Sequence, residues 1–141
     1  MNILLAADGS DYTKRAARFL ADYVAQLAKP PQVSLLHVHA PLPYNRAVAV
    51  VGKKAVEKYQ LEECEKALQV AEKELRKAGV DYEAHWMVGE ISASVKAFVK
   101  DHDIDLVVMG SHGHTALGNL ALGSVATKLL ASLKTPILIV R

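Results

Sequence analysis

The amino-acid sequence predicts an α/β fold in which helices cover both faces of an open, five-stranded parallel sheet. Five short apolar runs alternate with four amphipathic stretches, a pattern typical of strand–helix–strand units. Most of the runs are almost continuously apolar, as strands buried on both faces are. We expect the strand order 3-2-1-4-5, with strands at residues 3–7, 33–38, 82–87, 106–109 and 137–140.

Capping and turn residues set the bounds of the first two helices. Ser10 can accept a hydrogen bond from the backbone at the start of a helix that runs to about residue 28, where two prolines stop it. A second helix over residues 55–78 has apolar residues at three- and four-residue spacing and ends at Gly79. This spacing indicates that one face of the second helix packs against the sheet.

The remaining helices and two irregular segments follow from similar signals. A third helix is expected over residues 92–102, and a fourth runs from Gly123 to a point before Pro136. Residues 40–54 contain prolines and a glycine, so they are predicted to be an irregular connection. Residues 110–122 form a long loop between a strand and a helix, and loops of that length are functional candidates.

Size and charge limit the class of protein. The 141 residues are the size of one domain, so we expect a single domain over residues 1–141. The 17 basic and 15 acidic residues leave a formal charge of +2, without the basic excess that indicates nucleic-acid binding. We therefore expect no nucleic-acid partner.

Hydropathy and cysteine content point to a reducing, aqueous compartment. No apolar run approaches the roughly 18 residues that span a bilayer, and Met1 leads directly into a strand-like run, so we expect no signal peptide. Cys64 is the single cysteine, which excludes an internal disulfide, and it is expected to pack on the apolar face of its helix. We expect a cytoplasmic protein that does not insert into membranes.

The strand order indicates where a ligand binds. Crossovers between parallel strands are right-handed, and ligands bind beyond the carboxyl ends of the strands, where the winding reverses. In the expected order the reversal lies between the first and fourth strands. The two segments that border it are Ala7-Asp8-Gly9-Ser10 and Met109-Gly110-Ser111-His112-Gly113.

A glycine-rich motif follows the fourth strand and runs into a helix. It begins at Gly110, ends at Ser124 and reads G-x2-G-x9-G-S, with Gly113 and Gly123 at the inner glycine positions. Glycines let backbone amides approach an anion, a helix N-terminus offers unpaired N–H groups, and the serine adds a hydroxyl donor. The chemistry of these residues alone predicts an anion site.

The chain lacks the residues that three other kinds of phosphate site require. A receiver domain needs an aspartate at the end of its third strand, where this chain has Trp86-Met87-Val88-Gly89. A dinucleotide-binding fold needs G-x-G-x-x-G in the first strand-to-helix turn, and a P-loop needs G-K-[ST]. Neither motif is present.

With these motifs the whole chain resembles the universal stress proteins, in their nucleotide-binding subclass. The resemblance rests on the Asp-Gly-Ser turn after the first strand, His37-Val38 at the end of the second, the Gly89 turn and the spaced glycine motif. It implies a universal stress protein domain over residues 1–141, with the Rossmann-like fold of the adenine nucleotide alpha hydrolases. It also implies ATP, alone or with Mg²⁺, as the bound cofactor.

Eight nucleotide-binding residues are implied by the resemblance and two more are expected from their place in the chain, while no residue is assigned as catalytic or metal-ligating. The ten are Ala7, His112, Asp8, Val38, Met109, Gly110, Gly113, Gly123, Ser124 and Val125. The first two border the expected crevice. Asp8 and Val38 are implied at the adenine, Met109 and Gly110 near the ribose, and the last four around the phosphates.

Several of these polar residues have a second interpretation. Asp8 is alternatively a turn carboxylate that accepts from its own backbone. His37 and His39 lie two residues apart at a strand end, as ordinary polar residues or as a pair of metal ligands. His112 and His114 in the glycine motif are either donors to a phosphate or exposed loop residues.

Two functional hypotheses follow. The first is an ATP-binding universal stress protein that responds to nucleotide in stress or regulation. It is at most a slow ATPase, because no residue is placed as a general base and none resembles an arginine finger. The second is a non-catalytic interaction module that recruits a regulatory protein partner, with its glycine motif vestigial or binding another anion.

The last strand predicts a homodimer. In the expected order it lies at the edge of the sheet, and residues 136–140 carry no charge that would discourage pairing with another strand. The resemblance to universal stress proteins implies that the same strand of a second copy covers this edge. Twofold pairing of identical edges closes the assembly at two copies.

Overall fold

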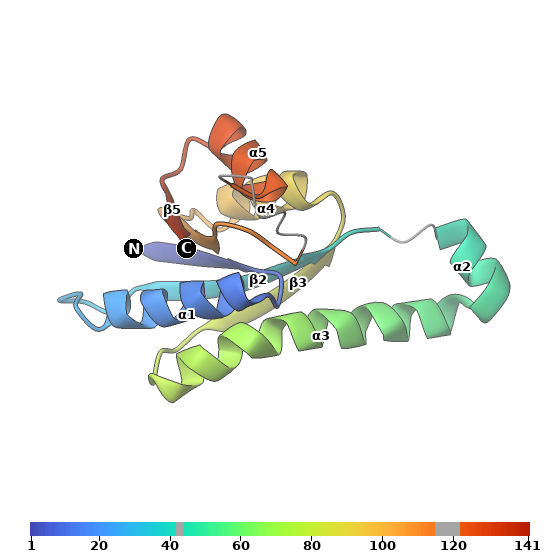
Figure 1. The fold of residues 1–141 in the computed structure, drawn as a ribbon, viewed down its shortest axis with the longest axis horizontal. Helices are drawn as coiled ribbons and strands as arrows, with labels where there is room; N and C mark the ends of the chain where they lie inside the picture. The colour runs from blue at the N-terminus through green and yellow to red at the C-terminus, as the bar shows by residue number, and fades with distance from the viewer. Residues whose placement is uncertain (42–43, 115–121) are drawn as a thin grey trace.

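The apolar runs form the five strands of one sheet, and all of its strands are parallel (Figure 1). The computed structural model of the chain describes residues 1–41, 44–114 and 122–141. The strands are β1 (Asn2–Ala7), β2 (Gln32–His39), β3 (Glu83–Val88), β4 (Leu106–Gly110) and β5 (Ile137–Val140). Their order, β3-β2-β1-β4-β5, confirms the predicted order.

β1 lies at the centre of the sheet and contributes to the core on both faces. Ile3 pairs with Val33 of β2 on one side and with Leu106 of β4 on the other. Ile3, Leu4 and Leu5 are fully buried. Because successive side chains of a strand point to opposite faces, Leu4 and Leu5 enter two separate apolar clusters.

The described residues form five helices, and four of them cover the two faces of the sheet in pairs. They are α1 (Asp11–Val24), α2 (Tyr44–Val51), α3 (Lys53–Lys77), α4 (Ile91–Asp101) and α5 (Ser124–Ser132). α1 and α3 pack on one face, and α4 and α5 pack on the other (Figure 1). Cys64 of α3 is fully buried, which confirms that it packs in the core. Within the described ranges no helix is long and apolar enough to cross a membrane.

The first helix begins as predicted but ends earlier. Ser10 is its N-cap, and the Ser10 Oγ accepts a hydrogen bond from the Thr13 backbone N–H at 3.3 Å. The helix ends at Val24 rather than near residue 28. Beyond that point the Leu27 N–H donates to Val24 O, a bond of three-residue span that forms a turn instead of continuing the helix.

The prediction of an irregular connection over residues 40–54 is wrong for most of that segment. Residues 44–51 form α2, and α3 begins at Lys53. Gly52, with a φ of 86°, separates the two helices, and Pro41 lies before α2. Glycine with a positive φ ends helices and proline is tolerated before them. The residues that suggested irregular structure therefore flank a helix.

The two edge strands are less buried than the central ones. On β3, Trp86 and Val88 are 46% and 42% exposed. All four residues of β5 are partly buried. Burial on both faces, which the apolar runs predict, therefore holds for the inner strands of the sheet and weakens toward its edges.

The turn from β1 to α1 depends on Gly9. Its φ of 80° lies in the left-handed region that only glycine adopts readily. Its backbone also lies against α3, since a Cβ at this position would be 2.9 Å from Ala67 Cα. The turn thereby brings the end of β1 close to α3 and leaves Asp8 at the carboxyl end of the sheet.

We expect Gly9→Ala to destabilise the fold more than Gly79→Ala. Both glycines have a positive φ, 80° and 70°, but a Cβ at Gly79 would meet nothing within 4 Å. An alanine in the left-handed backbone conformation lowers the stability at both positions, and the collision of its Cβ with Ala67 lowers it further at Gly9 only. Urea unfolding should show a loss of about 1–2 kcal/mol for Gly79→Ala and about 2–5 kcal/mol for Gly9→Ala. Equal losses in the two variants would show that the contact with Ala67 has no effect.

Candidate functional site

A cavity of about 520 Å³ lies at the carboxyl ends of β1, β2 and β4, where the strand order reverses. Its volume is typical of small-molecule sites. The first residues of α4 and α5 complete its wall. The cavity brings together all ten residues predicted to bind a nucleotide, which are Ala7, Asp8, Val38, Met109, Gly110, His112, Gly113, Gly123, Ser124 and Val125.

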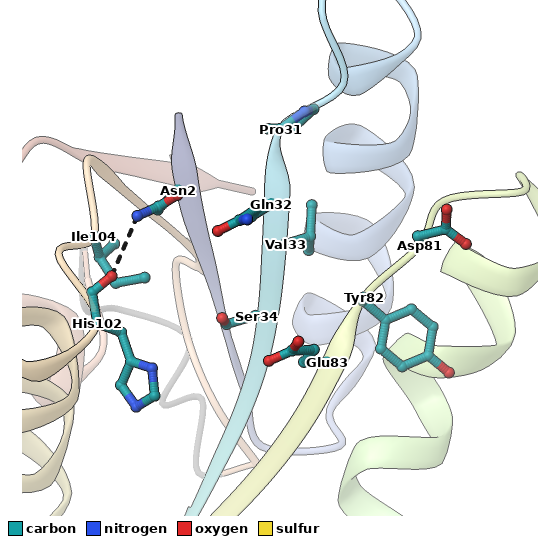
Figure 2. A pocket seen from close by; sticks show the side chains of 10 residues that line it. All are labelled: Asn2, Pro31, Gln32, Val33, Ser34, Asp81, Tyr82, Glu83, His102 and Ile104. Carbon is teal, nitrogen blue, oxygen red and sulfur yellow. Dashed lines mark hydrogen bonds between the residues drawn. The ribbon is translucent and has the colours of Figure 1, made fainter.

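A second cavity, of about 300 Å³, lies at the opposite, amino-terminal end of the sheet (Figure 2). Ser34 and Glu83, register partners on β2 and β3, line it together with His102 from the end of α4. On its rim the Asn2 side-chain amide donates to the His102 carbonyl at 3.3 Å (Figure 2). Ligands of open parallel sheets bind at the carboxyl ends of the strands. The cavity beside Asp8 is therefore the candidate site.

The two oxygens of the Asp8 carboxylate have different surroundings. Oδ1 accepts from the Ser10 N–H at 3.0 Å and from the Thr13 hydroxyl at 2.7 Å. Oδ2 lies against Gly113, so close that a Cβ on Gly113 would collide with it. The turn-carboxylate interpretation of Asp8 therefore holds for Oδ1, while Oδ2 stands at the cavity.

Two histidines donate hydrogen bonds to the backbone at the end of β1. His37 Nδ1 donates to Ala7 O at 2.8 Å, and His114 Nε2 donates to Asp8 O at 2.8 Å. Each of these nitrogens carries a proton, because a carbonyl oxygen only accepts. In neutral His37 the other ring nitrogen is then an acceptor. Both side chains line the cavity.

The His39 ring lies edge-on to the His37 ring, with the ring centroids 6.4 Å apart, but its hydrogen-bond partner is different. Its Nδ1 donates to Ala40 O at 2.6 Å, and its ring lies edge-on to Tyr59 of α3, with the ring centroids 6.5 Å apart. It does not line the cavity. In the part of the chain that the structure describes, no three His, Cys, Asp or Glu side chains are grouped closely enough to hold a metal ion.

The two ends of the glycine motif are held side by side. The Gly123 N–H donates to Ser111 O at 2.8 Å, and the Ser111 N–H donates to Val140 O at the end of β5 at 2.7 Å. Ser111 is almost fully buried. These bonds fix both sides of the motif to the sheet, whereas residues 115–121, which belong to the predicted loop, lie outside the described residues.

Two glycines of the motif lie close to neighbouring segments of the chain, Gly110 more tightly than Gly123. A Cβ on Gly110 would lie 2.6 Å from the Tyr12 Cβ, so the end of β4 passes directly under the first turn of α1. A Cβ on Gly123 would lie 3.2 Å from both Ser111 O and His112 Cα. The backbone approaches at this site are therefore close even before a ligand is considered.

The start of α5 supplies the groups suited to an anion. Its N-cap is Gly123, whose lack of a side chain leaves the first-turn N–H groups without a side-chain cap. Ser124 and Val125 of this first turn line the cavity, and so does His112. No lysine or arginine is among the described residues that line it. An anion would therefore be bound by backbone N–H groups, a hydroxyl and imidazole rather than by a cationic chain.

Several residues of the cavity wall were not predicted from the sequence. Thr13 and His37 contribute polar groups, and Ile91 and Val95 of α4 contribute apolar surface. The four-residue spacing of the last two at the start of a helix is a signal that could have placed them on one wall. Thr13 could have been found from its position three residues after the capping Ser10, where side chains turn back toward the cap.

Burial lowers the pKa of His37, and the hydrogen bond to Ala7 O offsets this only in part. His39 and His114 lower it further, and Asp8 raises it. The folded protein therefore favours neutral His37. The unfolded chain binds this proton more readily, because its histidine has an ordinary pKa.

We expect the fold to lose stability as the pH falls through the ordinary titration range of histidine. Because the pKa of His37 is lowered in the folded state, its contribution is complete above that range and is lost below it. His37→Asn keeps a donor for Ala7 O, because its side-chain nitrogen is attached to Cγ as Nδ1 is, and it removes the titration. Urea unfolding at about pH 8 and about pH 5.5 should show a larger loss for the wild type than for His37→Asn. Parallel pH profiles would refute this assignment.

Comparisons with known proteins agree on one family over the whole chain. The sequence model of the universal stress protein family matches residues 1–141. A universal stress protein of Thermus aquaticus is 34% identical over 140 residues, which are 99% of this chain and 97% of that protein. Universal stress protein Slr1230 of Synechocystis is 32% identical over 139 residues, 99% of this chain, and the chain spans 42% of its length.

Solved structures share the fold over nearly the whole chain. The structure of MJ0577, a universal stress protein of Methanocaldococcus jannaschii, has a TM-score of 0.82 at 26% identity and covers 99% of this chain and 94% of its own. A universal stress protein of Archaeoglobus fulgidus in complex with dAMP has a TM-score of 0.70 at 22% identity, with 100% and 98% covered. A universal stress protein in complex with cAMP has a TM-score of 0.70 at 23% identity, with 100% and 97% covered.

Proposed function

Because the chain belongs to the universal stress protein family, we propose that it binds ATP, alone or with Mg²⁺, in the cavity at the carboxyl ends of β1, β2 and β4. One observation carries this proposal: the cavity combines the Asp8 carboxylate with the uncapped start of α5. A carboxylate oxygen accepts from a base N–H, and a helix N-terminus favours phosphate. The dAMP and cAMP complexes of two relatives support an adenine nucleotide as the ligand.

The adenine binds at the Asp8 end of the cavity. Val38 and Met109 line the cavity and belong to the apolar cluster under α4 and α5. They are 7% and 6% exposed, and the surface that they show offers an apolar contact to a base. The exocyclic amine of adenine donates to Asp8 Oδ2. Guanine has a carbonyl oxygen at the corresponding position, which would face the carboxylate as a second acceptor. The site therefore favours adenine over guanine.

The phosphates bind at the start of α5. Gly113, Ser124 and Val125 supply backbone N–H groups, Ser124 adds a hydroxyl, and His112 lies beside them. Gly123, whose own N–H is bonded to Ser111 O, has no side chain to obstruct the phosphates. Hydrogen bonds to a charged group contribute about 1.5–3 kcal/mol each, so a few of them suffice for roughly micromolar affinity. Since the described lining contains no lysine or arginine, Mg²⁺ carried by the nucleotide would offset the phosphate charge. The ribose then spans Met109 and Gly110, beside Ala7.

The protein acts in this proposal as a nucleotide-responsive regulator in the stress response of the cytoplasm, and not as an efficient ATPase. The carboxylate of the described cavity lining, Asp8, accepts two local hydrogen bonds through Oδ1 and faces the base through Oδ2. It is thus not placed to activate water at the phosphates, where efficient hydrolysis needs a positioned base and a stabilising cation.

Retained nucleotide distinguishes this proposal from the interaction-module hypothesis. Protein purified from cells without added nucleotide would be denatured, and the released small molecules would be identified by mass spectrometry. ATP or another adenine nucleotide in near-stoichiometric amount supports the proposal. Absence of any nucleotide, together with absence of ATP binding in solution, favours a module that recruits a regulatory protein and whose glycine motif is vestigial.

We expect Gly113→Val and Gly123→Val to lower ATP affinity at least tenfold while the fold survives. A side chain at Gly113 would collide with Asp8 Oδ2, and one at Gly123 would press on the Ser111 and His112 backbone. Gly79→Ala, at a site remote from the cavity and open to solvent, is the control. Isothermal titration would measure the affinity, and circular dichroism would report the fold. Unchanged ATP affinity in both valine variants would show that the anion site is elsewhere.

We also propose that β5 pairs with β5 of a second copy. β5 is an edge strand, it carries no charge, and its side chains are only partly buried. Unpaired apolar edges favour association with another strand. An isologous twofold contact would cover both edges at once and end the assembly at two.

The dimer predicts a specific response to substitutions in β5. Sedimentation of the native chain at micromolar concentration should give about twice the monomer mass of 15.3 kDa. Pro136 O and Val140 O accept from β4, so the backbone groups of the alternate residues Ile137 and Ile139 point to the free edge. Ile139→Pro removes one of these edge donors, and Ile139→Lys sets two like charges near the twofold axis, so both variants should shift toward the monomer. A native chain that sediments as a monomer would contradict the dimer.

A further inference from the structure

We propose that Thr13 is a positioning residue for base recognition, whose hydroxyl holds the Asp8 carboxylate in the orientation that presents Oδ2 to an adenine amine. This inference rests on the proposed function, because it assigns to Thr13 the selectivity of that same site. Thr13 was not among the residues that the sequence predicted to bind nucleotide. We infer its positioning role from its hydrogen bonds, its burial and its place in the cavity wall.

The Thr13 hydroxyl is bonded to Asp8 in two directions. Oγ1 donates to Asp8 Oδ1 at 2.7 Å and accepts from the Asp8 backbone N–H at 2.9 Å. A hydroxyl has one proton to donate and lone pairs to accept with, so both bonds are satisfied at once. The Thr13 backbone N–H donates to Ser10 Oγ, and the side chain is 2% exposed. Thr13 is therefore fixed by α1 and in turn fixes Asp8.

These bonds determine which carboxylate oxygen meets the ligand. Oδ1 is used by two donors that both belong to the start of α1, the Ser10 N–H and the Thr13 hydroxyl. Because a carboxylate is planar, Oδ2 then points away from these donors, and it lies where Gly113 leaves room for it. Among the described residues none donates a hydrogen bond to Oδ2. It is the oxygen available to a ligand N–H.

Loss of the hydroxyl should act on selectivity more than on the shape of the cavity. Thr13→Val keeps the size and branching of the side chain but removes both bonds to Asp8. The carboxylate then retains one local donor and can rotate, so its oxygens no longer present a fixed acceptor to the base. Thr13→Ser restores a hydroxyl at the same atom. A residue that only fills space would not distinguish these two variants.

The test measures ATP and GTP affinity by isothermal titration for the wild type and for four variants. Thr13→Val, Thr13→Ser and Asp8→Ala probe the site. Thr135→Val is the matched control, since Thr135 precedes β5 at the other end of the sheet. We expect Thr13→Val to bind ATP about tenfold more weakly, the loss expected for a carboxylate acceptor that is no longer held in place. GTP affinity should change much less, and the serine and control variants should match the wild type.

A double-mutant cycle and a fold measurement complete the test. In the Asp8→Ala background, Thr13→Val should cause no further loss of ATP affinity, because both substitutions remove the same acceptor. Circular dichroism would show that each variant is folded, and Thr13→Ala would replace any valine variant that is not. Thr13→Val that keeps full ATP affinity, or that loses ATP and GTP affinity equally, overturns this inference alone. A wild type that binds neither nucleotide overturns the proposed function together with it.

Discussion

The hydrogen bonds of the Asp8 turn are the interaction on which the fold and the candidate site both depend. Within a few residues they end the central strand β1, cap α1 and fix one carboxylate oxygen. The positive φ of Gly9 makes the turn possible, and the missing Cβ lets it lie against Ala67 of α3. A change that relaxes this turn would therefore alter packing between helices and the position of an acceptor at the cavity.

The other side of the crevice is fixed by the sheet in a similar way. β4 is the direct neighbour of β1, with Ala6 paired to Met109, so the two bordering segments are about one strand spacing apart where they leave the sheet. Beyond that point Ser111 is bonded to Val140 and to Gly123. The separation of the Asp8 side from the start of α5 is thus set by backbone bonds of the fold. A ligand that contacts both sides needs little rearrangement of the described residues.

The sequence predicts strands and strand order well because apolar runs and turn residues are local signals, whereas the missed features depend on contacts between distant segments. The helix over residues 44–51 was missed because its flanking proline and glycine were interpreted as breaks rather than as boundaries. The role of His37 depends on Ala7, 30 residues away in sequence. The turn interpretation of Asp8 is confirmed for Oδ1, while the nucleotide interpretation stays a prediction that concerns Oδ2, and no local pattern in the sequence distinguishes the two oxygens. Edge exposure of Trp86 likewise follows from its place in the sheet.

Binding of an adenine nucleotide at the carboxyl ends of the strands is best tested by locating ATP on the molecule. Backbone amide signals of ¹⁵N-labelled protein would be followed by NMR during titration with ATP. If ATP binds there, the signals of Asp8, Gly113 and Ser124 shift and saturate together, while those of Gln32 and Glu83 at the opposite cavity stay unchanged. Shifts confined to the cavity around Gln32 and Glu83, or no shifts at all, would contradict binding at this site.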